Sequence, residues 1–307
     1  MRKLTEGRKM YLSVMAIFAV YGIVFIIFDD WDRHSKAPLI ESSDWRLVLF
    51  TLFFMAVLSL LLHRYAHRMD QRISREQAEQ QNHMRRQLTQ NIAHELKTPV
   101  ASILGYTETL LEHPELPTES QRQFLTRSLA QSQRLTALLN DISTLNRMDY
   151  AADMIDKEQV NLSDIVADIA KETELSRQQK QMTLDNRLPA DIVIKANPSL
   201  IYSIFRNLTD NAINYAGQGT AITLSAVELG DHWKFTFSDN GTGVERKHLK
   251  RLFERFYRVD KGRSRSMGGT GLGLAIVKNA VMLHGGTIVA TNRPNGGLCF
   301  DFTIKKK

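Results

Sequence analysis

The sequence predicts a multidomain protein with two transmembrane helices, an antiparallel helical hairpin and a C-terminal α/β sandwich. Three observations support this fold class. Long apolar runs occupy 10–28 and 47–62, and two helical patterns with wide apolar stripes follow between 84 and 149. From 150 to the C-terminus, short strand patterns alternate with helical ones. The 307 residues suffice for about two folded domains besides the membrane segments.

Residues 1–66 are predicted to form a membrane region. Helices over about 10–28 and 47–65 are expected to cross the bilayer, with 29–46 as a short external loop. Basic residues flank the outer ends of both runs, so the positive-inside rule places the N-terminus and the C-terminal bulk in the cytoplasm. The first run is too long for a cleaved signal peptide, and no small-residue cleavage site follows it. A polar loop is favoured over a metal or proton sensor at His34.

The charge and the cysteine content exclude two other classes of protein. A single cysteine, Cys299, rules out a disulfide framework and cysteine-rich metal sites. The net charge of +7 is concentrated beside the apolar runs and in the stretch Arg246–Arg265. Because no nucleic-acid-binding motif accompanies either cluster, the sequence predicts no nucleic-acid partner.

The segment that follows the membrane region is predicted to be helical throughout. Residues 67–83 form a polar linker without glycine or proline, and 84–149 form two helices joined by the turn His113–Pro117. Thr118 is expected to cap the second helix. A hairpin of two helices is too small to bury apolar stripes this wide, so two chains are expected to pair as a homodimer with a four-helix bundle.

His94 lies off the apolar seam of the first hairpin helix, so its imidazole is expected to face water or a partner. Thr98 follows one turn later on the same face. A single exposed histidine is usually an ordinary surface residue. Three motifs farther along the chain favour a different interpretation: Arg206–Tyr215 (RNLTDNAINY), Asp239–Gly243 (DNGTG) and Gly268–Leu274 (GGTGLGL).

In this order, the stretch around His94 and these three motifs resemble the histidine box, asparagine box and two glycine boxes of bacterial two-component sensor histidine kinases. The resemblance runs from about Met84 to the C-terminus. It implies a dimerisation and histidine phosphotransfer domain at 84–149. It also implies a catalytic ATP-binding domain at 150–307, with the fold shared by gyrase and Hsp90-type ATPases.

The pattern within 150–307 agrees with such an α/β sandwich. Strands are predicted at Lys157–Leu162, Met182–Leu188, Ile192–Lys195, Ala221–Glu228, Trp233–Ser238, Thr287–Thr291 and Leu298–Ile304. Helices are predicted at Ser163–Gln179, Pro198–Ala216 and Leu272–Leu283.

The resemblance also implies a function. The protein is expected to be a kinase of the bacterial inner membrane that autophosphorylates His94 from Mg-ATP. It is then expected to transfer the phosphoryl group to an aspartate in the receiver domain of a response regulator, and to dephosphorylate that regulator. Glu95 is implied as the acid/base residue, and Thr98 as the residue that positions water for the phosphatase reaction. Both roles rest on the resemblance.

The nucleotide-binding residues follow from the same resemblance. Asn211 is the implied Mg²⁺ ligand, because its amide oxygen is a hard donor, and Asn207 supports it one turn earlier. Asp239 is expected to accept a hydrogen bond from the adenine amino group, and Tyr215 to lie beside the ring. The resemblance implies that the other nucleotide contacts come from glycines that let the backbone approach and from residues that bind phosphate. These are Gly241, Gly243, Arg258, Gly269, Thr270, Gly271, Leu272 and Gly273.

One position departs from the family pattern. Asn214 stands where a basic residue often precedes the tyrosine, so a phosphate contact is either missing or supplied by Arg258 or another lid cation. Two other functions fit parts of the sequence: an ATPase of the gyrase/Hsp90 class, and a scaffold that binds nucleotide without transfer. The hairpin around His94 and the membrane anchor argue against the first. The presence of His94, Asn211 and Asp239 together argues against the second.

Overall fold

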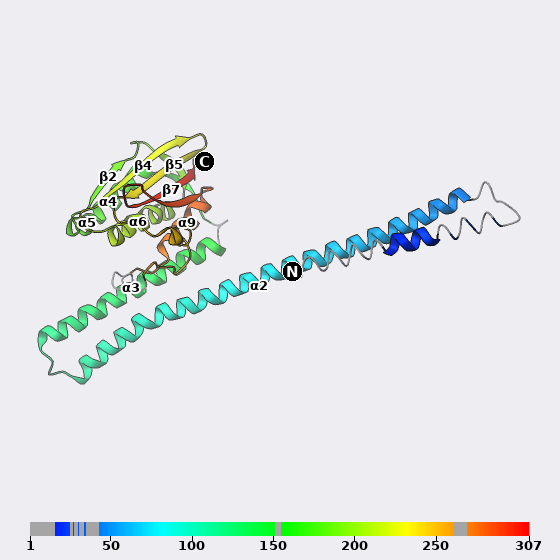
Figure 1. The fold of residues 1–307 in the computed structure, drawn as a ribbon. Coiled ribbons are helices and arrows are strands. Elements are labelled where there is room, and N and C mark those ends of the chain that lie inside the picture. Colours follow the sequence, from blue (N-terminus) through cyan, green and yellow to red (C-terminus); the bar gives the residue numbers. More distant parts are fainter. Residues whose placement is uncertain are drawn as a thin grey trace. The chain divides into compact units, whose positions relative to one another are not determined.

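The computed structural model describes residues 16–24, 27, 30, 34, 43–150, 155–260 and 269–306 (Figure 1). The chain divides into two compact units, 1–86 and 87–307. The boundary falls within the long helix α2 (Ser43–Glu112).

In the first unit, residues 16–24 are helical and pack against α2. The rings of Phe18 and Tyr21 lie 4.7 Å and 5.4 Å from the ring of Phe54. None of the helices in the described part of the chain is long and apolar enough to cross a membrane. The predicted span at 10–28 is described only at 16–24 and 27, where it is helical, and 47–65 is helical within α2. The two transmembrane helices are therefore not supported by the structure and stay predictions.

The second unit begins with the helical hairpin. Helix α2 ends at Glu112, before the predicted turn, and α3 (Thr118–Tyr150) follows that turn. Thr118, expected to cap this helix, is instead its first helical residue, since the N–H of Gln121 bonds to the carbonyl of Pro117. Between the two helices, the rings of Tyr106 and Phe124 meet at 5.7 Å. On each helix, a set of apolar side chains at helical spacing is at least half exposed: Val100, Leu104 and Leu111 on α2, and Leu125, Leu129 and Leu139 on α3. The hairpin therefore keeps apolar faces that the described residues of a single chain do not bury.

A five-stranded sheet with helices on one face confirms the predicted α/β sandwich (Figure 1). The strand order is β2 (Thr183–Arg187), β4 (Ala221–Leu229), β5 (His232–Asp239), β7 (Leu298–Lys305) and β6 (Ile288–Asn292). Only the β2–β4 pair is parallel among these described strands. A separate antiparallel pair joins β1 (Glu158–Asn161) to β3 (Val193–Ala196).

The helical layer differs from the prediction at one point. The helix predicted over Ser163–Gln179 is two helices, α4 (Leu162–Glu172) and α5 (Glu174–Gln179). Thr173 separates them, and both its N–H and its hydroxyl bond to the carbonyl of Ile169. The same hydroxyl bond occurs at Thr209 inside the continuous helix α6, so it does not by itself explain the break. A short helix that the sequence did not reveal, α7 (Arg246–Leu249), follows β5.

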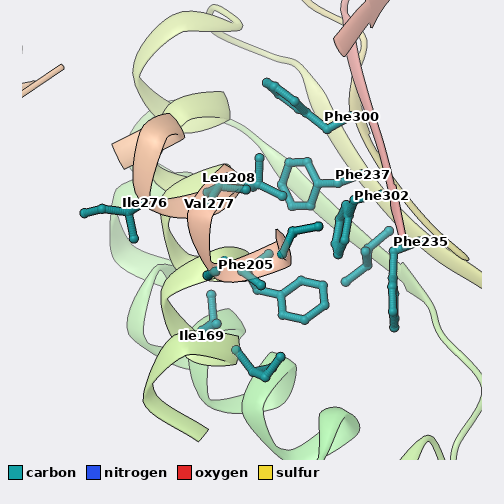
Figure 2. Packing of buried hydrophobic residues seen from close by; sticks show 14 of the residues in the cluster. Ile169, Phe205, Leu208, Phe235, Phe237, Ile276, Val277, Phe300 and Phe302 are labelled. Atoms are coloured by element: carbon teal, nitrogen blue, oxygen red, sulfur yellow. The ribbon is translucent and has the colours of Figure 1, made fainter. Parts of the chain in front are cut away.

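The core lies between the sheet and two long helices, α6 (Pro198–Tyr215) and α9 (Gly273–Leu283). Figure 2 shows Phe205 of α6 against Phe235 and Phe302 of the sheet. The ring centroid of Phe205 lies 5.7 Å from that of Phe235 and 5.8 Å from that of Phe302, and Phe235 stacks on Phe302 at 5.1 Å. Truncating a buried phenylalanine to alanine costs about 3–5 kcal/mol. This cluster therefore fixes the face that α6 turns to the sheet, and leaves the opposite face for a site.

His284 joins the end of α9 to the start of α6. Its Nδ1 donates to the carbonyl of Ala280 at 2.7 Å, and its Nε2 accepts the N–H of Asn197 at 3.0 Å. Asn197 in turn caps α6 by accepting the N–H of Leu200. Both bonds require the neutral imidazole, because a protonated ring has no acceptor nitrogen. Burial lowers the pKa of His284 below its ordinary value of 6.5.

A pH dependence of stability follows from this environment. The unfolded chain takes up a proton that the folded His284 resists, so its contribution to stability is present above about pH 6.5 and is lost as the pH falls below that value. We expect the melting temperature of the protein to fall between pH 7 and about pH 5. A His284→Gln variant should melt lower at pH 7 but lose less on acidification. An unchanged pH slope in the variant would assign the loss to other groups.

Candidate active site

A cavity of about 320 Å³ lies beside α6, the turn after β5 and the start of α9. Its volume is in the range typical of small-molecule sites. The lining residues are Asn207, Asp210, Asn211, Asn214, Tyr215, Ala216, Asp239, Thr242, Gly243, Val244, Leu252, Tyr257, Arg258, Val259, Asp260, Gly269, Thr270, Gly271, Gly273, Leu274 and Leu298.

Helix α6 supplies the amide side of the cavity. Its apolar face enters the core, so Asn207 and Asn211, one turn apart, come to the cavity wall. The amide nitrogen of Asn207 donates to the carbonyl of Ser203 at 2.8 Å, which fixes the direction of its Oδ1. A Cβ at Gly273 would lie 2.5 Å from that oxygen. Glycine at the first residue of α9 therefore lets the helix N-terminus approach Asn207 closely.

Asp239 ends β5 as a buried carboxylate. Its Oδ1 accepts the N–H groups of Gly241 at 2.9 Å and Leu298 at 3.2 Å. Burial raises the pKa of Asp239, and these two bonds oppose that rise. A Cβ at Gly241 would lie 2.2 Å from the carbonyl oxygen of Ala216, so this glycine packs the turn onto the end of α6. The backbone therefore sets the orientation of the carboxylate.

The glycine-rich loop before α9 is joined to the segment that carries Arg258. The N–H of Phe256 donates to the carbonyl of Gly271 at 2.8 Å, and both residues have positive φ angles, +62° and +76°. A left-handed backbone is uncommon for phenylalanine. Phe253 and Phe256 pack against the core. The loop and the arginine therefore form one wall of the cavity.

Two polar side chains of that wall reach the helical hairpin. Thr270 donates its hydroxyl proton to Asp141 of α3 at 2.7 Å, and it accepts the N–H of Leu272 at 3.2 Å. Arg258, whose side chain is 6% exposed, donates to Glu95 of α2 at 3.1 Å. The hairpin and the α/β sandwich therefore meet at the cavity.

The predicted acceptor stands next to this contact. His94 is exposed on α2, while the adjacent Glu95 is 15% exposed and also lies 3.6 Å from Arg134 of α3. Thr98 is exposed one turn after His94 and donates to the carbonyl of His94 at 3.3 Å. Burial raises the pKa of Asp141, partly offset by its bond from Thr270. These hairpin residues are not part of the cavity wall itself.

Most of the predicted nucleotide-binding residues line the cavity: Asn207, Asn211, Tyr215, Asp239, Gly243, Arg258, Gly269, Thr270, Gly271 and Gly273. Gly241 and Leu272 do not. Gly241 packs against Ala216, and Leu272 is fully buried. Among the described residues on the wall, Arg258 is the one cation.

Sequence reasoning missed several residues of the site. Asp210 lines the cavity and bonds to Arg206 at 2.9 Å; its position beside Asn211 in the motif was the available signal. Burial raises the pKa of Asp210, and Arg206 opposes that rise. Tyr257 also lines the cavity. Asp141 carried no signal, because it looks like any polar residue on a helix.

A hairpin with an exposed histidine, joined to an α/β sandwich with a glycine loop at a polar cavity, is the architecture of histidine kinases. Residues 84–151 match the "His Kinase A (phospho-acceptor) domain". Residues 196–307 match the family described as "Histidine kinase-, DNA gyrase B-, and HSP90-like ATPase". The chain therefore belongs to the two-component sensor histidine kinases.

Curated relatives support the same family. The chain is 33% identical over 220 residues to "Sensor-like histidine kinase SenX3" of Mycolicibacterium smegmatis, covering 72% of this chain and 57% of that one. It is 30% identical over 232 residues to "Sensor histidine kinase WalK" of Bacillus subtilis, covering 75% and 38%. The chain thus spans only about 38–57% of the length of these two relatives.

Solved structures share the fold. The histidine kinase AdeS of Acinetobacter baumannii is similar with a TM-score of 0.58 at 23% identity, over 70% of this chain and 98% of that one. The histidine kinase ThkA, solved in complex with the response regulator protein TrrA, has a TM-score of 0.58 at 19% identity, over 72% and 61%.

Proposed function

We propose that the protein is an ATP-dependent protein-histidine kinase that phosphorylates His94 and passes the phosphoryl group to an aspartate of a response regulator. The observation that carries this proposal is the contact between Arg258 on the cavity wall and Glu95. Glu95 is the residue directly after His94, so a nucleotide in the cavity has the acceptor helix beside its phosphate end.

The cavity wall supports one orientation of ATP. Asp239 accepts a hydrogen bond from the adenine amino group, and Tyr215 lies beside the base. Thr270, the glycine loop and the N-terminus of α9 face the phosphates, where backbone N–H groups and the helix dipole stabilise negative charge. Arg258 approaches the γ-phosphate.

The donor set also suits Mg²⁺. Asn211 offers a neutral amide oxygen on the wall, which is the hard type of ligand that Mg²⁺ prefers together with nucleotide phosphates. Among the described residues, no cluster of three His, Cys, Asp or Glu side chains forms a metal site independent of nucleotide. When bound, the ion neutralises phosphate charge during transfer.

In the proposed reaction, a neutral imidazole nitrogen of His94 attacks the γ-phosphorus, and the bond to the oxygen of ADP breaks. Glu95 accepts the imidazole proton. The phosphoryl group then moves from His94 to a carboxylate oxygen of the regulator. Purified protein incubated with Mg²⁺ and γ-labelled ATP should acquire a label that is stable in alkali and labile in acid. ATP hydrolysis without labelled protein would instead favour an ATPase of the gyrase/Hsp90 class.

The exposed apolar faces of α2 and α3 support a homodimer through a four-helix bundle. Each fully buried leucine stabilises such an interface by about 1.5–3 kcal/mol. A response regulator is the proposed second partner, in line with the complex solved for ThkA. Light scattering of the purified protein tests the dimer, and a mass of one chain at micromolar concentration would contradict it.

We also propose that 10–28 and 47–65 anchor the protein in the bacterial inner membrane, with 29–46 outside and the domains from 84 onward in the cytoplasm. The flanking basic residues support this orientation. Recovery of the protein in the membrane fraction after alkaline extraction is the expected result. Release by alkali would show that these runs do not span the bilayer.

Thr98 should separate two activities of the hairpin. Its hydroxyl is exposed one turn after His94, where it is proposed to orient water toward the aspartyl phosphate of the regulator. A Thr98→Ala variant should keep autophosphorylation and lose most phosphatase activity, measured as decay of labelled regulator. Ser102→Ala, which also removes a hydroxyl bonded to its own helix, is the matched control. Equal loss of both activities in Thr98→Ala would instead assign Thr98 to helix structure.

A further inference from the structure

Two donors on the cavity wall are held by carboxylates of the hairpin. Thr270 donates to Asp141 at 2.7 Å, and Arg258 donates to Glu95 at 3.1 Å. Both donors line the cavity where the nucleotide phosphates are proposed to lie. A third contact lies outside the cavity wall: Arg255 forms two bonds of 2.8 Å with Asp149 near the end of α3.

The Thr270 hydroxyl can donate either to Asp141 or to a nucleotide phosphate, but not to both. A hydroxyl carries a single proton, and Thr270 gives it to Asp141. The oxygen of Thr270 meanwhile accepts the N–H of Leu272, which holds the side chain in place. To donate to a phosphate oxygen, Thr270 must leave Asp141. Asp141 and a phosphate are therefore exclusive partners of this hydroxyl.

Electrostatic repulsion from the hairpin carboxylates also opposes binding of the nucleotide phosphates. Asp141 is a partly buried carboxylate at the glycine loop, and a phosphate placed at that loop meets an unfavourable like charge. Arg258 is nearly buried in its contact with Glu95, so this carboxylate already takes part of its hydrogen-bonding capacity when a γ-phosphate approaches. The hairpin thus presents an anion to each of the two side chains that are proposed to contact phosphate.

We propose that Asp141 competes with the nucleotide phosphates for Thr270, so that docking of the hairpin on the glycine loop opposes ATP binding. This inference rests on the proposed function, because it takes the cavity to be an ATP site. Coupling between two binding events is reciprocal. ATP binding and docking of Asp141 on Thr270 therefore weaken each other.

Nucleotide affinities of full-length variants test this competition. The Asp141→Asn variant keeps the shape of the side chain and removes its charge. Charge-assisted hydrogen bonds are about twice as strong as neutral ones, so ATP and ADP should bind up to about tenfold more tightly. Adenosine lacks phosphates and should bind the variant and the wild type equally. Glu108→Gln, at an exposed carboxylate of α2, is the matched control and should change none of the three affinities.

A second variant weakens docking without altering the cavity wall. Asp149→Asn removes the ion pair with Arg255, so it should also tighten ATP and leave adenosine unchanged, by a smaller factor. Unchanged or weaker ATP binding in Asp141→Asn, or an equal gain for adenosine, would overturn the competition. Failure of the wild-type protein to bind ATP at all would instead overturn the proposed function, and the inference with it.

Discussion

A His94→Gln variant is expected to lose autophosphorylation completely while it binds ATP with nearly wild-type affinity. His94 is exposed on α2 and is not part of the cavity wall, so its loss removes the nucleophile and leaves the nucleotide contacts in place. Glutamine keeps a polar side chain that helices tolerate well, and the hairpin should remain folded. Labelling with γ-labelled ATP and a separate measurement of ATP affinity check the two halves of this expectation.

The hairpin contains a matched control for this variant. His113 is also exposed, at the turn between α2 and α3, where its Nδ1 lies 3.1 Å from Glu115. A His113→Gln variant should therefore label like the wild type. Acid-labile label on the His94→Gln protein would mean that another residue accepts the phosphoryl group. A large loss of ATP affinity would mean that His94 also belongs to the nucleotide site.

Separation of acceptor and nucleotide gives the contact at Glu95 its importance. The imidazole and the cavity lie on different parts of the chain, and Arg258 and Thr270 of the cavity wall bond to hairpin side chains. Phosphoryl transfer depends mainly on placement and on neutralised charge. The residues that hold this contact therefore act on the rate through placement, besides the roles proposed for Glu95 and Arg258 in the reaction itself.

Most helices and strands of the sandwich could be predicted from the sequence. Each packs one side into the core, so its apolar residues recur at the spacing typical of a helix or a strand. In β7, alternate residues are buried from Leu298 to Ile304. The break at Thr173 could not be predicted, because no glycine or proline marks it in the sequence.

Some residues of the candidate site could likewise be predicted from the sequence, and others could not. Asn207, Asn211 and Asp239 could be predicted because their motifs place amides and a carboxylate on elements that are otherwise buried. Gly241 and Leu272 pack within the domain and do not line the cavity, so their assignment to the nucleotide stays a prediction. Asp141 acts through a contact to a residue far along the chain, which no local pattern encodes.

An Asp239→Asn variant is expected to bind ATP about ten- to a hundredfold more weakly. The Oδ1 of Asp239 accepts two backbone N–H groups, so an asparagine must turn its carbonyl oxygen to them and its NH₂ group toward the adenine amino group. Two donors then face each other, and a hydrogen bond to a charged acceptor is lost. The fold should tolerate the change, because a neutral amide avoids the desolvation that raises the pKa of this buried carboxyl.

Comparing the affinities for ATP and adenosine distinguishes the loss of affinity in the Asp239→Asn variant from the effect expected of Asp141→Asn. Because Asp239 is proposed to read the base, adenosine should lose as much affinity as ATP in the Asp239→Asn variant. Asp301→Asn is the matched control: this carboxylate lies on the neighbouring strand β7, accepts a bond from Thr236 at 2.7 Å and is not part of the cavity wall. It should leave both affinities unchanged. Wild-type affinity in the Asp239→Asn variant would remove Asp239 from the base-binding site and with it the proposed orientation of ATP in the cavity.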